Sequence, residues 1–551
     1  MPLSAGRCGP MDHSTTTQAT EFSGRSALEA DPAAPAVGTQ PEGRVLWRNT
    51  PNWLPLVAVL AVQAGLSIRL VKADTAFLDE ATYLWAGHLE WAHWLHGTPV
   101  PQFSAYFSGA PFIYPPLGAL ADSIGGLTAA RILSLIFMLG ATALLWGATS
   151  HLYGRRAAFF AAALFAVLGP TLHLGSFATY DAMAVFLVAF AHWCVIRADD
   201  QGDAVGRMVV AGIALALANA VAYSSVLYDP VLILMVLLTA FPKPGGKVVA
   251  RRIGILLIVL VTMLLAALLL GGSSYIGGFE RTTLARVPGS ASPLAVLRDS
   301  GSWTGIILVA ATCGIVISLV TRQKKAQTWL LALVVIAAVL GPLDQARLHT
   351  ATSLSKHVGL GAWFAAIAAG YAVDWFVSAA PPGRNRVLTC GACVLALAFP
   401  ISLGASQSEA FATSWPNATS FIAIMGPTVG SNSGRLLVED PTIAEYYLPQ
   451  GSQWQRWSST RNIITPAGTS TGGPSQSAGV VGSGNAGTFA MYIREGYFSV
   501  IALNFSDTSS LDLAIAKDIS QSHYYYKAQV VPYGIEIPPI GQGTYVIWKH
   551  R

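Results

Sequence analysis

Residues 253–271 read IGILLIVLVTMLLAALLLG, a stretch of 19 residues without a charge that directly follows Arg251 and Arg252. As a helix this stretch is roughly 28 Å long, which matches the ~30 Å hydrocarbon core of a bilayer. Similar apolar runs recur along the chain, and together they predict eleven transmembrane spans. These lie at approximately 53–71, 132–150, 157–170, 180–196, 208–223, 230–241, 253–271, 304–321, 328–341, 358–378 and 387–404.

The composition indicates the same class of protein. Of the 551 residues, 53% are hydrophobic and only 11% are charged, whereas soluble domains carry roughly 25% charged residues. This composition excludes a single soluble enzyme, a disordered chain and a disulfide-rich secreted module. The net charge of +5 is too small to indicate a nucleic-acid partner. We therefore expect a polytopic α-helical membrane protein.

The five cysteines give no sign of a disulfide framework or a zinc site. All of them precede the polar C-terminal region. Cys390 and Cys393 form a CxxC pattern, but it lies in an apolar run and has no second CxxC to complete a zinc site.

The chain divides into three regions by composition. Residues 1–46 are rich in Ala, Pro, Ser, Thr and Gly, which is typical of a disordered tail, here expected in the cytoplasm. Residues 47–404 form the membrane module, and within it residues 72–130 form a long first external loop with juxtamembrane helices. Residues 405–551 are expected to form an extracytoplasmic domain.

The distribution of Lys and Arg predicts the orientation, because cytoplasmic loops retain positive charge. Thirteen cations lie in one alternating set of short loops: Arg155, Arg156, Arg197, Arg207, Lys243, Lys247, Arg251, Arg252, Arg322, Lys324, Lys325, Arg384 and Arg386. The much longer loops of the opposite set hold seven: Lys72, Arg131, Arg281, Arg286, Arg298, Arg347 and Lys356. We therefore expect a multi-pass protein of the cell membrane, with its N-terminus inside and its C-terminal domain outside.

The C-terminal region alternates strand-like with helix-like segments. Its strand-like runs are 435–439, 499–505, 524–532 and 544–548. Asp440 before Pro441, and Asp507 before an apolar-periodic stretch, are typical helix starts. The pattern predicts a small α/β domain. Residues 468–487 are rich in Gly and Ser and are expected to form a loop, since no strand-to-helix junction with a Lys accompanies them.

The first external loop contains two adjacent acids, Asp79 and Glu80, followed by a segment with helical spacing at 81–95. Trp and His within this segment are typical of a helix in the membrane interface. The two acids therefore lie at a helix N-terminus, where they either cap the helix or serve as a base facing a bound hydroxyl or cation. Residue type alone leaves both interpretations open.

Three histidines in the same segment, His88, His93 and His96, raise the question of a metal site. At most two of them share one face of a helix, and an i, i+3 pair is common at interfaces. No cofactor is assigned from the sequence, and a divalent ion is left open.

Further candidates lie on the same predicted membrane face. Tyr114 begins a Tyr-Pro-Pro-Leu stretch, Arg131 lies at the outer end of the second span, and Asp181 leads the fourth span. An acid at the end of a span is often only solvated. Here the acids, the Pro-Pro turn, the Arg and the leading Asp follow one another in this order on one membrane face.

In that order, the sequence resembles the membrane glycosyltransferases of the GT-C fold. Within this fold it resembles the protein O-mannosyltransferase and aminoarabinose-transferase group (family 39-like). Two additional stretches support the resemblance, Gly277–Arg281 and Ser355–His357. The resemblance covers roughly residues 53–404. The aminoarabinose transferases carry an acidic-basic pair just before the Pro-Pro, where this chain has Ile113-Tyr114, so the sugar and the acceptor are not carried over.

The resemblance implies transfer of a sugar from a polyprenyl phosphate to an acceptor hydroxyl on the external face, with inversion. It implies Asp79 as the general base and Glu80 as its neighbour or as a group that orients the acceptor. Asp181, Tyr83 and Tyr114 are expected to contact substrate. The expected partners are a polyprenyl-phosphate-linked sugar, an acceptor protein, glycan or lipid, and membrane lipids.

The leaving lipid phosphate requires cations, and external cations are scarce in this chain. We expect the donor phosphate to bind among Arg131, Lys356, Arg281, Arg286, Arg347 and His357. The alternative is that these are ordinary cations which contact lipid headgroups.

Two other classes of protein are alternatives to a glycosyltransferase. A secondary transporter is expected to show internal repeats and ionisable groups near the bilayer midplane. No repeat is visible here, and the ionisable residues gather at the outer edge. A membrane-anchored binding or assembly protein would not require eleven spans.

Overall fold

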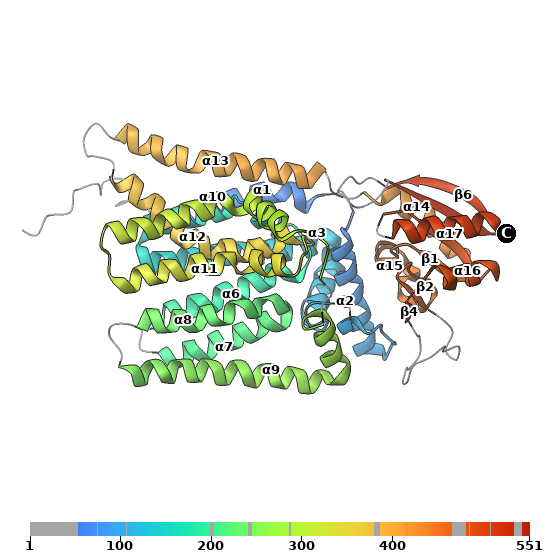
Figure 1. Ribbon diagram of the computed structural model, residues 1–551, viewed down its shortest axis with the longest axis horizontal. Helices are drawn as coiled ribbons and strands as arrows, with labels where there is room; N and C mark the ends of the chain where they lie inside the picture. Colours follow the sequence, from blue (N-terminus) through green and yellow to red (C-terminus); the bar gives the residue numbers. More distant parts are fainter. Residues whose placement is uncertain are drawn as a thin grey trace, which may run out of the picture. The chain divides into compact units, whose positions relative to one another are not determined.

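Figure 1 shows the computed structural model of the chain. Its described residues are 53–73, 75–105, 107–198, 203–240, 245–285, 288–379, 386–413, 415, 417–464, 481–483, 485–506, 508–533 and 543–551. The expected tail 1–46, Arg286, Asp507 and most of the expected loop 468–487 lie outside these residues.

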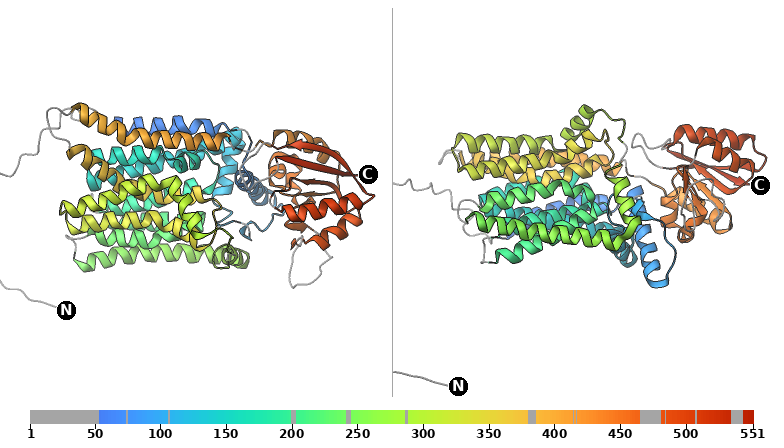
Figure 2. Two further views of the ribbon diagram at one scale, coloured as in Figure 1. Left: turned by 45° about the horizontal axis from the view of Figure 1, so that its top comes forward. Right: turned by 60° about the horizontal axis from the view of Figure 1, so that its bottom comes forward.

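Long helices dominate the region up to residue 413, where they lie side by side in a bundle (Figures 1 and 2). The helices are α1 Leu54–Val71, α2 Leu78–His96, α3 Tyr114–Tyr153, α4 Arg155–Ala166, α5 Gly169–Leu174, α6 Tyr180–Ile196, α7 Ala204–Val221, α8 Asp229–Ala240, α9 Gly246–Thr282, α10 Pro293–Val320, α11 Lys325–Arg347, α12 Leu354–Ala379 and α13 Arg386–Thr413.

Each of the eleven expected spans falls on a helix of this bundle. In the part of the chain that the structure describes, eight helices are long and apolar enough to cross a membrane. The remaining expected spans correspond to shorter helices: α4, which is followed by the one-and-a-half-turn helix α5, and α6 and α8. The predicted polytopic helical class is thus confirmed, while the exact number of crossings stays a prediction.

Helix α3 consists of two parts separated by a kink. Gly125 and Gly126 have non-helical dihedral angles, and Gly126 has φ 67°, a value that an L side chain rarely adopts. The segment from Tyr114 to Ile124 therefore leaves the axis of the longer part, which contains the expected span 132–150.

Helix α12 is the most buried of the candidate spans. It packs against α4, α10 and α11. A methyl group added at Gly361 would lie 2.4 Å from the carbonyl oxygen of Ala338 on α11, and one added at Gly370 would lie 2.5 Å from that of Ala157 on α4. Small residues let membrane helices approach this closely, which explains why the central helix is rich in Gly and Ala. This packing fixes the end of α12 that carries Lys356.

The C-terminal region forms the expected small α/β domain. Its helices are α14 Thr419–Gly430, α15 Thr442–Tyr447, α16 Ala486–Arg494 and α17 Ser509–Gln521, and its strands are β1 Arg435–Val438, β2 Trp457–Ser458, β3 Asn462–Ile464, β4 Val481–Ser483, β5 Phe498–Leu503, β6 Tyr525–Pro532 and β7 Thr544–His550. The main sheet has the order β2-β1-β5-β7-β6. Strands β2, β1 and β5 are parallel, and β7 is antiparallel to both of its neighbours. Strands β3 and β4 form a separate antiparallel pair.

Alternating residues of the central strands supply two hydrophobic cores, because successive side chains of a strand point to opposite faces. Leu437 and Ile501 face the core under α16 and α17. Leu436 faces the other core, which contains α14 and also Ala76 and Ala81 from the segment around the start of α2. The α1–α2 connection is therefore part of the hydrophobic core of the C-terminal domain.

Candidate active site

The site is built around the first turn of α2. The chain leaves α1 at Val71 and enters α2 at Leu78, and the described residues between them, 72–73 and 75–77, lie outside regular secondary structure. Phe77 is the N-cap residue in an extended conformation. Glu80 occupies the third helical position, and its Oε2 accepts the backbone N–H of Phe77 at 2.9 Å. This contact is half of a capping box, so Glu80 performs the capping role considered for the acidic pair.

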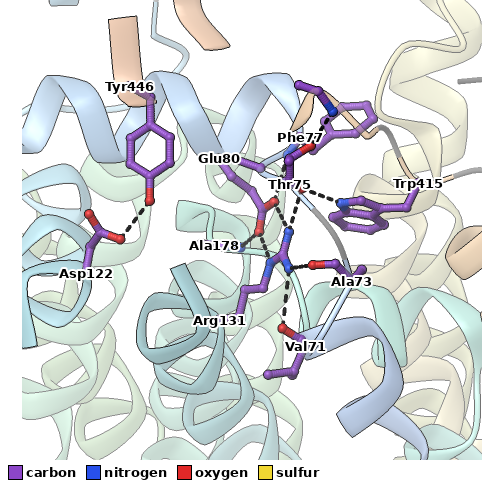
Figure 3. Close-up of polar contacts among 12 residues, drawn as sticks. Val71, Ala73, Thr75, Phe77, Glu80, Asp122, Arg131, Ala178, Trp415 and Tyr446 are labelled. Carbon is purple, nitrogen blue, oxygen red and sulfur yellow. Dashed lines mark hydrogen bonds and ion pairs between the residues drawn. The ribbon is translucent and has the colours of Figure 1, made fainter. Parts of the chain in front are cut away.

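The carboxylate of Glu80 is completely buried and fully occupied by hydrogen bonds (Figure 3). Its Oε1 accepts Arg131 Nε and the backbone N–H of Ala178, each at 2.8 Å. Its Oε2 accepts Arg131 Nη2 at 2.8 Å in addition to the N–H of Phe77. Each oxygen thus accepts two hydrogen bonds, which uses the acceptor capacity of a carboxylate. The buried Glu80 does not fit the expected contact with an acceptor.

Arg131 is buried as completely as Glu80, with 1% of its surface exposed. Its guanidinium has five N–H donors, and five hydrogen bonds use them. Two of these go to Glu80. The other three go to backbone carbonyl oxygens of the α1–α2 connection, those of Val71 at 3.3 Å, Ala73 at 2.6 Å and Thr75 at 3.1 Å. The geometry therefore runs against the expectation that Arg131 holds a phosphate, and indicates that Arg131 fixes the course of this connection.

Asp79 has different surroundings, although it is the next residue to Glu80. Its side chain is 32% exposed, and its Oδ2 accepts Lys356 Nζ at 2.5 Å. Lys356 also lies 3.5 Å from Asp181 Oδ2, which in turn accepts the hydroxyl of Thr179 at 2.8 Å. The structure thus brings together three predicted residues, Asp79, Asp181 and Lys356. One ammonium lies between two carboxylates, so the cluster retains a net negative charge.

Aromatic rings flank this cluster. The ring of Tyr83 lies 4.9 Å from that of Phe107 and 4.8 Å from that of Tyr180, and Lys356 Nζ lies 5.0 Å from the ring of Phe177. Burial raises the pKa of Tyr83 well above its ordinary value, and the charge of the neighbouring Asp79 raises the pKa further. Tyr83 therefore presents a neutral hydroxyl close to the acids.

A small pocket opens beside Lys356 and Asp181. Its lining includes Ser225 and Tyr228 from a short 3-10 helix, Tyr223–Tyr228, and His357 from α12. The hydroxyls of Ser225 and Tyr228 are buried and have no hydrogen-bond partner among the described residues. Polar groups of this kind are available to a ligand or to water.

Tyr114 lies in the same buried cluster as Tyr83, whereas the remaining predicted cations have different partners or lie outside the description. Tyr114 is buried, and its hydroxyl lies 3.4 Å from Ser134 Oγ. Arg347 is exposed and pairs with Asp344 on its own helix at 2.8 Å. Arg281 lies in the last turn of α9, but its side chain is not described, and Arg286 is outside the described residues.

The three histidines of α2 do not come together at a metal site. His88 Nε2 lies 2.7 Å from Asp122 Oδ2, and His93 Nδ1 lies 2.8 Å from the carbonyl oxygen of Thr98. Among the described residues, no group of three His, Cys, Asp or Glu side chains is placed to hold a metal ion.

Several residues that hold the site in place were not predicted from the sequence. Thr75 accepts Trp415 Nε1 through its carbonyl oxygen at 2.9 Å, and its hydroxyl accepts the backbone N–H of Ala418 at 2.9 Å. Asp122 accepts the hydroxyl of Tyr446 at 2.7 Å (Figure 3). These partners are separated by more than 300 residues, so no local pattern could have indicated them.

Comparison with known proteins supports the resemblance over part of the chain. The sequence model of the family described as dolichyl-phosphate-mannose-protein mannosyltransferase matches residues 115–270. This match covers less than half of the chain, and it includes Arg131 and Asp181 but not Asp79 or Lys356. Among curated proteins, none matches the chain.

Solved structures share the fold over most of the chain. ArnT from Cupriavidus metallidurans in the apo state has a TM-score of 0.57 and 14% identity, covering 90% of this chain and 97% of ArnT. ArnT bound to undecaprenyl phosphate gives 0.57 and 13%, with 90% and 98% covered. The arabinofuranosyltransferase AftD from Mycobacteria gives 0.53 and 14%, covering 90% of this chain but 40% of AftD. The chain therefore has the GT-C fold, as the sequence predicted.

Proposed function

We propose that this protein is a membrane glycosyltransferase that moves a sugar from a polyprenyl phosphate to an acceptor hydroxyl. The observation that carries the proposal is the partly exposed carboxylate of Asp79, held by Lys356, which also faces Asp181 and lines a small pocket with it. The GT-C fold and the structure of ArnT with undecaprenyl phosphate support a lipid-phosphate donor.

Asp79 is the general base of the proposed reaction. The acceptor oxygen attacks the anomeric carbon from the side opposite the phosphate, and its proton passes to the Asp79 carboxylate. The bond between the anomeric carbon and the phosphate oxygen breaks, and polyprenyl phosphate leaves as an anion. The anomeric carbon of the product has the inverted configuration. A positioned base is required because the hydroxyl loses its proton as it attacks. A phosphate anion is a weak base and leaves without an acid.

Lys356 is the leading candidate for contact with the donor phosphate. Two of its three N–H donors face Asp79 and Asp181, and a phosphate oxygen in the adjoining pocket would meet the third. Attraction to the phosphate would draw the ammonium away from Asp79 and leave that carboxylate more basic. His357 lines the same pocket, and Arg281, Arg286 and Arg347 stay secondary candidates for lipid phosphate. We expect Tyr83 and Asp181 to contact the sugar or the acceptor.

The proposed reaction takes place on the external face of the membrane. The Lys and Arg distribution in the sequence supports this location, because it favours the start of α2 and the start of α12 on the side opposite the cation-rich loops. The lipid carries the donor sugar to this side, so no soluble nucleotide sugar is required there. The acceptor is a hydroxyl of a protein, a glycan or a lipid.

Release of polyprenyl phosphate tests the proposal, because this product is common to every donor sugar. Purified protein in lipid nanodiscs is incubated with a panel of short-chain polyprenyl-phosphate sugars and an extract of cell-envelope acceptors. The released polyprenyl phosphate is measured by mass spectrometry. We expect release with at least one donor, and loss of release in Asp79→Asn. Equal release by the parent and the Asn variant would exclude Asp79 as the base.

A further inference from the structure

Helix α15 of the C-terminal domain contacts both α2 and the first part of α3. The hydroxyl of Tyr446 donates to Asp122 Oδ1 at 2.7 Å (Figure 3), and the other oxygen of Asp122 lies 2.7 Å from His88 Nε2. Tyr446 also packs against a small buried cluster of Leu84, Ala130 and Ala178. One tyrosine of the C-terminal domain is thereby connected through Asp122 to the middle of α2.

The adjacent tyrosine of α15 contacts the segment that carries the proposed base. The backbone N–H of Ala76 donates to the hydroxyl of Tyr447 at 2.7 Å. Ala76 is fully buried in the core that it shares with α14 and the sheet. Asp79 follows only three residues later, so this hydrogen bond lies at the base of the turn that presents Asp79 to Lys356.

Other contacts from the same domain extend along α2. Trp85 Nε1 donates to the carbonyl oxygen of Gly451 at 3.1 Å, and Trp454 Nε1 donates to that of Pro99, just after α2, at 3.0 Å. The C-terminal domain therefore holds α2 before its first turn, in its middle and beyond its end.

Ala73 and residues 75–77 depend on these contacts because these described residues lie outside regular secondary structure. The Ala73 and Thr75 carbonyl oxygens accept Arg131, the Thr75 carbonyl also accepts Trp415, and the Ala76 N–H is satisfied by Tyr447. Their conformation is thus set from two sides, by Arg131 in the membrane module and by the C-terminal domain. An error of about 1 Å in the placement of a catalytic group can cost on the order of a hundredfold in rate.

We infer that the C-terminal domain positions Asp79 for catalysis, with Tyr447 and Tyr446 of α15 as positioning residues. The inference rests on the proposed function, in which Asp79 is the base. In this arrangement the domain is a structural part of the catalytic site and not a separate module attached to it. Neither tyrosine touches the reacting atoms, and both act through the backbone and side chains that aim Asp79.

The test removes one hydroxyl and keeps the ring. In Tyr447→Phe, the Ala76 N–H loses its acceptor while the packing of α15 is preserved. Tyr525→Phe is the matched control, because the hydroxyl of Tyr525 likewise accepts a backbone N–H, that of Phe498 at 3.2 Å, inside the same domain. Tyr446→Phe serves as a second variant at the α15 contact. All are made in the full-length protein.

Two measurements are made on each variant: amide hydrogen exchange of residues 75–80, and kcat and KM for polyprenyl phosphate release. We expect faster exchange of this segment and a fall of about tenfold in kcat in Tyr447→Phe, with the donor KM within twofold of the parent. Tyr446→Phe changes both quantities in the same direction by less. The control leaves both at the parent values.

Exchange and release at control levels in Tyr447→Phe would overturn the inference. So would faster exchange combined with an unchanged kcat, because the segment would then be loosened without consequence for transfer. If the parent itself releases no phosphate with any donor, the proposed function fails. The inference that the domain positions Asp79 for catalysis then fails as well. Hydrogen exchange still shows in this case whether Tyr447 holds residues 75–80.

Discussion

Asp79 and Glu80 are neighbours in the sequence with opposite environments, and this difference separates their roles. Glu80 is buried, caps the start of α2 and pairs with Arg131. Asp79 is partly exposed and pairs with the ammonium of Lys356, which also faces Asp181. A carboxylate that reacts must be reached by a hydroxyl, and of the two only Asp79 meets this condition.

Replacing Asp79 by Asn keeps the size of the side chain and removes its basicity. We expect polyprenyl phosphate release to fall by about 10²–10⁴-fold, the range typical of general-base catalysis. The melting temperature should fall less than on loss of Glu80, because Asp79 is partly exposed, Asn still accepts a hydrogen bond from Lys356, and Asp181 stays beside the ammonium. Glu80→Gln should show the reverse pattern, with clear destabilisation. Turnover near that of the parent in the Asn variant would assign Asp79 a structural role.

Arg131→Ala tests whether this arginine supports the structure or binds phosphate. The variant leaves Glu80 as a buried charge without its partner, and removal of one member of a buried pair typically costs about 3–5 kcal/mol. We expect a large loss of thermal stability in detergent. Arg347→Ala is the control, because its exposed pair with Asp344 should contribute at most about 1 kcal/mol.

The double variant Glu80→Gln with Arg131→Met completes this test. Replacing both partners removes the uncompensated charge, so the double variant should be more stable than Arg131→Ala. An alanine variant that is as stable as the parent but no longer releases phosphate would instead assign Arg131 to the donor phosphate, as the sequence had suggested.

The sequence identified the acids of the site better than their partners. Asp79 and Asp181 stand out because each leads a predicted helix on the same membrane face, in the order in which the sequence resembles the GT-C glycosyltransferases. The role of Arg131 was not predictable, since three of its acceptors are backbone carbonyls, which any residue type provides. Tyr447 was likewise hidden, because its partner is the N–H of an alanine 371 positions away.

At the scale of the helices, local hydropathy was sufficient to place the bundle. Each expected span falls on a helix, because an apolar run that crosses a membrane must satisfy its own backbone hydrogen bonds. Hydropathy does not reveal which helix is central. That position depends on close contacts such as the one between Gly361 and Ala338, which require knowledge of the neighbouring helix.

Gly361→Ala should destabilise the contact between α12 and α11. The added methyl group would lie 2.4 Å from a backbone oxygen, and overpacking of this kind typically costs about 1–3 kcal/mol. Gly305→Ala in α10 is the control, because a methyl group there meets nothing within 4 Å and alanine favours the helix by up to about 1 kcal/mol. Thermal unfolding in detergent compares the two, and equal stabilities would contradict the close packing.

At the scale of the whole molecule, the last question is which side of the membrane holds the proposed site. Eight helices in the described region are long enough to cross, and α4, α6 and α8 are shorter. An odd number of crossings puts the two ends of the chain on opposite sides, and an even number puts them on one side. The cation-rich loops, with Arg251 and Arg252 among them, favour the odd arrangement with the C-terminal domain outside.

A reporter enzyme that is active only outside the cytoplasm, fused after Arg551, should therefore be active. The same reporter inserted after Gln323, between α10 and α11 and beside Arg322, Lys324 and Lys325, should be inactive, because that loop belongs to the cation-rich set. Since α15 contacts the segment that carries Asp79, the C-terminal fusion reports the side of the candidate site as well. A silent fusion after Arg551 combined with an active insertion after Gln323 would place the site in the cytoplasm, and a lipid-linked sugar exposed on the external face would then be excluded as the donor.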